Sequence, residues 1–355
     1  MVAWVLLSPA FALAAENLVT DDTAVPARIY TTQEERRGAG LEHRITEALT
    51  LSALAELEYR DGRYRQFGSS YRNAAHDFSK TLQLGLNLKP RPSVKAELIY
   101  EYQVDTMSER HRIDEAMLAF EGRNLELEVG RLNLPFGAYL SHFASGPLLD
   151  FGETRGDAAV LSYKAHDRLD LSAFWYQGRT EKLGANDSNR DFGLALESLP
   201  FPFLKFGMSY LSDLADSKER LLRGSDNRYQ RRVDAVSVYA VGDFDRFEAS
   251  AEFVGALGSF TELDADRNRP RAWNLELSFF PVRNLEVSLR FEASKELGGA
   301  PRRQSGLAFA WRVKKNASLT VEYLSGSFQR GFAQDSSGSD IDRIERFGTQ
   351  FGLAF

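Results

Sequence analysis

Residues 49–59 read Leu49-Thr50-Leu51-Ser52-Ala53-Leu54-Ala55-Glu56-Leu57-Glu58-Tyr59, and this stretch shows the pattern that decides the fold. Apolar side chains occupy the odd-numbered positions, and the even-numbered positions are polar except for Leu54. Successive side chains of a β-strand point to opposite faces, so a period of two residues predicts a strand with one apolar and one polar face.

The same alternation recurs along the rest of the chain, where we count sixteen strand-like runs. The segment 232–241 is ambiguous, because Val236 and Val238 compete with Val233 and Ala235 for the apolar face. Seven short turns, such as 122–124 and 281–284, alternate with eight long links, including 60–74, 104–112 and 132–157. Short turns at one end and long loops at the other are typical of outer-membrane β-barrels. The predicted fold class is therefore all-β, a transmembrane antiparallel barrel of about sixteen strands.

Composition supports a barrel over two soluble domains, which the length of 355 residues alone would suggest. Charged residues make up 26% and aromatic residues 12%, yet no apolar run reaches the roughly 18–20 residues that a membrane helix needs. The net charge of −6 argues against a nucleic-acid partner. Cysteine is absent, which excludes disulfides and thiol catalysis and is compatible with an envelope compartment.

No enzyme motif is recognisable. The nucleophile elbow, the phosphate-binding Walker loop and the zinc-binding His-Glu-x-x-His sequence are all missing. The five histidines are scattered without the spacing of metal ligands. We therefore expect no catalytic site, no metal and no cofactor, and a protein that is not an enzyme.

The chain divides into three expected parts. Residues 1–14 resemble a signal peptide, because 2–7 are apolar and Ala12-Leu13-Ala14 fits the cleavage rule, although no cationic segment precedes them. A buried N-terminal strand is the alternative. Residues 15–47 would form a periplasmic lead-in, and 48–355 the barrel. The last strand ends in Phe355, which is similar to the signal that outer-membrane proteins present to the barrel-assembly machinery. That similarity implies the outer membrane of a Gram-negative bacterium.

The link 132–157 is the feature with most functional promise. It is rich in aromatic and aliphatic side chains, and its Pro and Gly residues set stiff bends. We expect it to fold into the barrel lumen as a long third loop and to narrow the pore. The predicted constriction comprises Arg131, Pro135, Phe136, Gly137, Tyr139, Phe143, Asp150, Glu153 and Arg155. Arg131 and Arg155 would pair with Glu126 or Glu128, and the aromatic side chains would line the passage or pack beneath it.

The polar face of the strands predicts the lumen wall, to which we assign Glu126, Glu128, Arg290, Arg312 and Arg346. Acidic residues outnumber basic ones on this face. Two interpretations stay open: a solvated wall of cross-strand ion pairs, or an acidic lumen that favours cations.

One part of the loop resembles a known family. Gly130-Arg131, Pro135-Phe136-Gly137, Gly146-Pro147-Leu148 and Phe151-Gly152-Glu153-Thr154-Arg155 are similar to the third-loop region of the LbtU-type siderophore porins. The resemblance implies an outer-membrane barrel that takes up iron–siderophore complexes. Phosphate-selective porins look similar at Pro-Phe-Gly, so an anion-selective porin is an alternative. Against it, the loop region offers Arg131 and Arg155 but also Asp150, Glu153 and Asp157.

The predicted function is passive, loop-constricted diffusion of a small solute, for which a ferric siderophore is one candidate. A structural sheath around a multihaem cytochrome is the alternative from another class; its haem would come from a partner, since the chain lacks Cys-x-x-Cys-His. The expected partners are outer-membrane lipid and the solute. A homotrimer is left open.

Overall fold

The computed structural model describes residues 43–69, 72–106, 108–184, 191–217, 221–222 and 228–354. The predicted signal peptide, residues 15–42 of the predicted lead-in, and Phe355 lie outside these described residues. The end of the lead-in forms the short strand β1 (His43–Arg44), which pairs with the first barrel strand.

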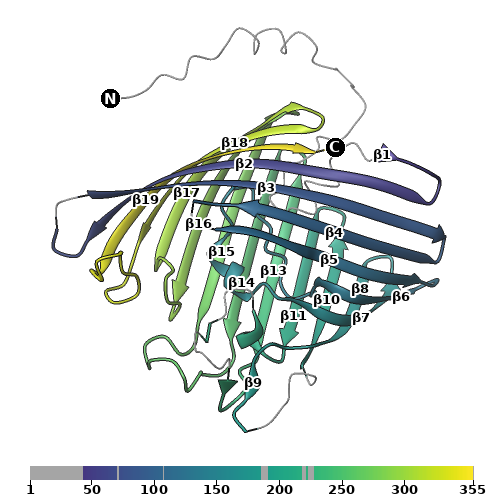
Figure 1. Cartoon of the computed structure of the whole chain (residues 1–355), viewed down its shortest axis with the longest axis horizontal. Coiled ribbons are helices and arrows are strands. Elements are labelled where there is room, and N and C mark those ends of the chain that lie inside the picture. The colour runs from purple at the N-terminus through teal and green to yellow at the C-terminus, as the bar shows by residue number, and fades with distance from the viewer. Residues whose placement is uncertain are drawn as a thin grey trace.

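Sixteen long antiparallel strands close into one barrel, as predicted (Figure 1). In chain order they are β2 (Leu49–Gln66), β3 (Arg72–Arg91), β4 (Val94–Val104), β5 (Glu109–Glu121), β6 (Leu125–Asn133), β7 (Arg155–His166), β8 (Leu169–Tyr176), β10 (Asp191–Phe201), β11 (Leu204–Leu211), β13 (Ala235–Phe244), β14 (Phe247–Ala256), β15 (Arg271–Val282), β16 (Leu285–Lys295), β17 (Arg303–Lys314), β18 (Ala317–Ser327) and β19 (Ile341–Ala354). The pairing of β19 with β2 closes the ring.

Two further strands lie in the long links. β9 (Glu181–Lys182) and β12 (Arg228–Tyr229) pair with each other in parallel, apart from the barrel sheet. No helix in the described part of the chain is long and apolar enough to cross a membrane.

Two predicted links are shorter than expected. β2 continues to Gln66 and β3 starts at Arg72, within the predicted loop 60–74, and β4 and β5 likewise extend into the predicted loop 104–112. The alternation of apolar side chains stops in these extensions, but the antiparallel backbone pairing continues through them. Arg60 pairs with Glu58, and His76 lies 3.1 Å from Asp61, so the extended hairpin carries charged side chains suited to water. Alternation therefore reports contact with lipid, and it underestimates strand length beyond that contact.

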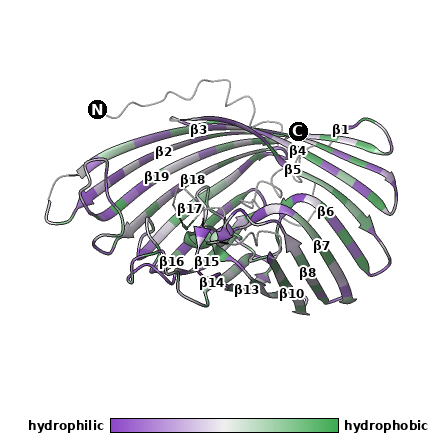
Figure 2. Cartoon of the chain, turned by 60° about the horizontal axis from the view of Figure 1, so that its bottom comes forward, coloured by the Kyte–Doolittle hydropathy of each residue, from purple (hydrophilic) through white to green (hydrophobic). Residues whose placement is uncertain are grey.

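The barrel is apolar outside and polar inside. Leucine, phenylalanine and tryptophan side chains stand exposed on the outer face, among them Leu84, Leu194, Leu289, Phe309 and Trp311. Bands of opposite hydropathy alternate along the strands (Figure 2). The ambiguous segment is resolved by the same rule: Ala235 and Ser237 face inward, each 0% exposed, and Val236 and Val238 face outward.

Replacing Leu289 with arginine should impair folding into the membrane. Leu289 is 40% exposed on the outer face, opposite Leu277 on one neighbouring strand and Leu307 on the other. An arginine at a lipid-facing position near the membrane centre costs roughly 2–4 kcal/mol. The yield of folded barrel, measured by its heat-modifiable mobility in gels, should fall accordingly.

The matched control is Thr81→Arg, because Thr81 is half-buried on the lumen face of β3, opposite Glu56. Ser288 would be a poor control. It is 1% exposed, and its hydroxyl lies 2.7 Å from that of Ser278 in a tightly packed part of the lumen. Equal losses for Leu289→Arg and Thr81→Arg would contradict the assignment of faces.

Candidate functional site

The link between β6 and β7 folds into the lumen as predicted, over residues 134–154. Leu134 N donates to Thr154 O at 3.0 Å, which closes the base of the loop. The 3-10 helix η2 (Leu148–Gly152) packs against β14, β15 and β16. Phe136, Phe143 and Leu149 are each 0% exposed, so the loop is seated on the wall by its apolar side chains.

A tight bend at Gly137 starts the inward run. Its φ of +78° is in the left-handed region, and a Cβ there would lie 2.6 Å from the Tyr139 ring and 2.9 Å from the Glu252 carboxylate. Only glycine fits this position without displacing its neighbours.

Four glutamates of the wall accept hydrogen bonds from the loop backbone. Glu252 accepts from the N–H groups of Ala138 and Tyr139, at 2.7 Å each. The remaining bonds are His142 N to Glu276 at 2.8 Å, Ser145 N to Glu322 at 3.1 Å and Leu148 N to Glu292 at 2.6 Å. We call Glu252, Glu276, Glu292 and Glu322 the anchoring glutamates. They come from β14, β15, β16 and β18, so the loop is fixed across a broad part of the wall.

Arg290 of β16 holds the loop from below. It is 0% exposed, its Nε donates to Glu276 at 2.8 Å, and its Nη1 donates to the carbonyl oxygen of Ser145 at 2.9 Å. The guanidinium also lies 4.1 Å from the centre of the Phe143 ring. A buried guanidinium satisfied on several sides ties strand and loop together through charge-assisted hydrogen bonds.

His142, on the loop itself, is the second buried basic group. Its Nε2 lies 2.8 Å from Glu248, and its Nδ1 is in ion-pair contact with Glu286. Because both ring nitrogens face carboxylates, which only accept, the geometry favours the doubly protonated imidazolium. The side chain of His142 is 2% exposed, so this ion triad is sealed beneath the loop.

The predicted constriction residues between Pro135 and Glu153 lie together on the inward loop but differ in role, whereas Arg131 is on the outer face of β6. Phe136 and Phe143 are buried, so they pack beneath the passage and do not line it. Tyr139, Asp150 and Glu153 are half-buried at the loop surface, as is Pro135. The lumen-wall residues Glu126, Glu128, Arg290, Arg312 and Arg346 all occupy inward-facing positions of their strands, and Arg290 lies under the loop.

The predicted anchors for the loop ends are wrong. Arg155 contacts Asp114 and donates to Asn133 at 2.8 Å. Arg131 lies opposite Asp157 of β7 and shares the outer face of β6 with Leu127 and Val129. Glu126 and Glu128 lie on the inner face of the same strand. A side chain on one face of a strand cannot reach carboxylates on the other, so neither predicted pairing forms.

Sequence analysis also missed what holds the loop. Six glutamates occupy inward-facing positions of their strands, yet all six are under 8% exposed: Glu248, Glu252, Glu276, Glu286, Glu292 and Glu322. They are neither a solvated wall nor a ring of charge facing the passage, because the loop covers them. The sequence did show that these glutamates share the inward-facing register of neighbouring strands. It did not show at what height along the barrel axis each one meets the loop.

A cavity lies beside the loop at the short-turn end of the barrel. It has a volume of about 590 Å³ and is lined by Pro135 and Gly137, by the turn at 122–124, and by wall residues that include Glu126, Glu197 and Tyr239. Elsewhere on the wall, Arg346 of β19 and Arg60 of β2 occupy neighbouring inward-facing positions, and Arg60 is paired with Glu58. The inner face of the barrel therefore carries charges of both signs.

No model of a known protein family matches the chain, and no curated protein sequence matches it. Solved structures resemble its fold. The outer membrane channel DcaP of Acinetobacter baumannii aligns with a TM-score of 0.60 at 14% identity, covering 89% of this chain and 100% of that one. Pseudomonas putida OprB gives 0.58 at 9% identity, covering 87% and 94%. OmpT of Vibrio cholerae, in a form lacking loop L8, gives 0.54 at 12% identity, covering 87% and 100%. The chain thus has the fold of outer-membrane porins, and the apolar outer face of its barrel is suited to lipid.

Proposed function

We propose that this outer-membrane barrel is a passive channel in which the inward loop narrows the route for a small hydrophilic solute. The observation that supports the proposal is the fixed position of the loop. Five backbone N–H groups of the loop bond to the anchoring glutamates, and Arg290 bonds to its carbonyl oxygens. A loop tied to one side of the lumen leaves a constant opening along the other side.

The solute we propose first is an iron–siderophore complex, because the loop sequence from Gly130 to Arg155 resembles the third-loop region of the siderophore porins. The loop supports a small solute, because its contacts with β14, β15, β16 and β18 place it across part of the lumen. An anion-selective porin is the second candidate, and the specific observation in its favour is the inward-facing position of Arg346, next to Arg60, which is itself paired with Glu58. The covered glutamates weaken the acidic field that would have opposed an anion.

The sheath around a multihaem cytochrome is the weaker alternative. A cytochrome inside the barrel needs an open lumen, and residues 134–154 occupy that space with their apolar side chains buried. Co-purification of a haem protein with the barrel would favour the sheath over the channel.

The test is transport by the purified barrel. In liposomes, it should admit small neutral sugars and exclude larger oligosaccharides, and a ferric siderophore should enter faster than a neutral sugar of equal size. Failure of every small solute to enter a correctly folded barrel would overturn the channel; entry of sugars without preference for the siderophore would overturn only the proposed solute.

Charge on the open wall should set the ion preference. Arg346→Ala removes an inward-facing positive charge, so the reversal potential in a salt gradient should shift toward cations. Arg343→Ala is the control on the same strand, because Arg343 is exposed near its outer end. Equal shifts for both variants would mean that Arg346 does not lie on the ion path.

A further inference from the structure

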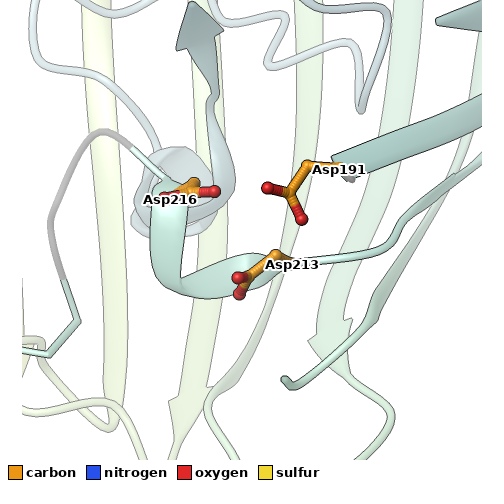
Figure 3. Close-up of side chains that lie close together, drawn as sticks. All are labelled: Asp191, Asp213 and Asp216. Atoms are coloured by element: carbon orange, nitrogen blue, oxygen red, sulfur yellow. The ribbon is translucent and has the colours of Figure 1, made fainter. Parts of the chain in front are cut away.

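Three aspartates from two outer loops converge at the end of the barrel opposite the short turns (Figure 3). Asp191 begins β10, Asp213 precedes the 3-10 helix η4 (Leu214–Asp216), and Asp216 ends it. One carboxylate oxygen of each lies within 4.8 Å of the others. Asp191 and Asp213 are each 0% exposed and Asp216 is 9% exposed, so the cluster is removed from water.

The loop backbone fixes two of these carboxylates in place. Asp213 Oδ1 accepts from Ala215 N at 2.9 Å. Asp216 Oδ1 accepts from Arg179 N and Thr180 N, at 2.7 Å each. The Oδ2 atoms of Asp213 and Asp216 are buried and accept no hydrogen bond. Two fixed, buried oxygens without a donor, turned toward one space, are the observation that points to a missing ligand.

Arg232 faces the cluster, at 3.1 Å from Asp191. Three carboxylates held this close together and away from water repel one another, which is costly. A cation among them would relieve that repulsion.

We propose that a calcium ion binds among Asp191, Asp213 and Asp216 and clamps residues 177–184 of one outer loop to residues 212–217 of the next. Carboxylate oxygens are hard ligands, and the cluster contains no nitrogen or sulfur ligand that would select a transition metal. Calcium accepts six to eight oxygen ligands in flexible geometry, whereas magnesium demands a regular octahedron and gives up its waters reluctantly. Loops outside the membrane would supply the remaining ligands as carbonyl oxygens and water.

The surroundings show what the clamp would do. The same two loops already meet through the parallel pair β9 and β12. Beneath the cluster, the Tyr176 hydroxyl donates to Asp213 O at 3.2 Å. Leu214 and Tyr229 of the outer loop belong to the apolar cluster that also contains Phe136 of the inward loop. A cation here would steady the outer mouth directly above the constriction.

The test uses the full barrel, folded in detergent and stripped with a chelator. Calorimetric titration with calcium should give one ion per chain, and terbium in its place should luminesce when the nearby Tyr176 and Tyr229 are excited. Asp213→Asn and Asp216→Asn should each weaken calcium binding at least tenfold. Asp264→Asn is the control, because Asp264 is an exposed aspartate of another outer loop.

A second variant keeps every carboxylate. A Cβ on Gly178 would lie 2.1 Å from Asp216 Oδ2 and 2.5 Å from Asp191 Oδ2, so Gly178→Ala puts a methyl group into the space for the ion. It should weaken calcium binding in a barrel that still shows folded mobility. The proposal is overturned if the wild-type barrel binds no calcium at millimolar concentration, or if the aspartate variants bind it unchanged. Equal binding of magnesium would overturn the assignment to calcium.

Discussion

Deleting residues 138–146 should raise the single-channel conductance of the barrel severalfold. The deletion removes the part of the loop that carries Phe143, His142 and four of the five backbone N–H groups bound by the anchoring glutamates. A barrel of sixteen strands without an inward loop encloses a wide aqueous channel. Planar-bilayer recordings measure the effect directly, and the discrimination between solutes by size should weaken in parallel.

The same deletion should also change ion preference. Glu252, Glu276 and Glu322 would lose their loop partners and face water in the shortened variant, so permeability should move toward cations. The control removes residues 336–338 from the outer link between β18 and β19, where Ser337 is exposed, and should leave conductance unchanged. If the inward deletion assembles and conducts as the wild type does, the loop does not narrow the passage.

Arg290→Met should destabilise the barrel by about 3–5 kcal/mol, the usual loss when one partner of a buried ion pair is removed. Methionine fills much of the space but leaves Glu276 and Glu292, each at most 2% exposed, without their positive neighbour. Unfolding by denaturant in detergent measures the loss. The loop should also become unsteady, which would appear as noise in single-channel current.

Two comparisons make the Arg290 result specific. Arg63→Met removes an arginine whose side chain is 60% exposed and lies 3.9 Å from Asp61, so it should cost at most about 1 kcal/mol. The double variant Arg290→Met/Glu276→Gln should recover part of the loss, because it neutralises a stranded carboxylate. A loss for Arg290→Met no larger than that for Arg63→Met would show that the pair contributes little to stability.

The barrel was predictable because lipid enforces a simple rule on every strand. A residue such as Leu289 must be apolar and its neighbours Ser288 and Arg290 need not be, so alternation, strand count and the long and short ends could all be predicted from sequence. The rule fails where its cause is absent. Near Arg60 and Asp61, beyond the apolar alternation, the ladder continues without it.

The candidate site was only partly predictable for a different reason. The inward path of the loop could be predicted from the apolar content of residues 132–157. The residues that hold the loop lie on strands far away in the sequence and could not be predicted in the same way. Strand parity separates Arg131 from Glu126, which could have been read from the sequence. No local pattern shows that Glu322 receives the loop at Ser145, because that depends on the depth and curvature of the closed barrel.

The bonds that hold the inward loop also set the order in which the molecule can be completed. The hydrogen bond from Ala138 N cannot form before Glu252, 114 residues later in the chain, is in place. The bond from Ser145 N likewise requires Glu322, which is 177 residues later. Contacts this distant in sequence form late, because long stretches of chain must be ordered first. The inward loop is therefore among the last parts of the barrel to reach its final position. We expect assembly intermediates that lack β18 to conduct ions more freely than the finished protein.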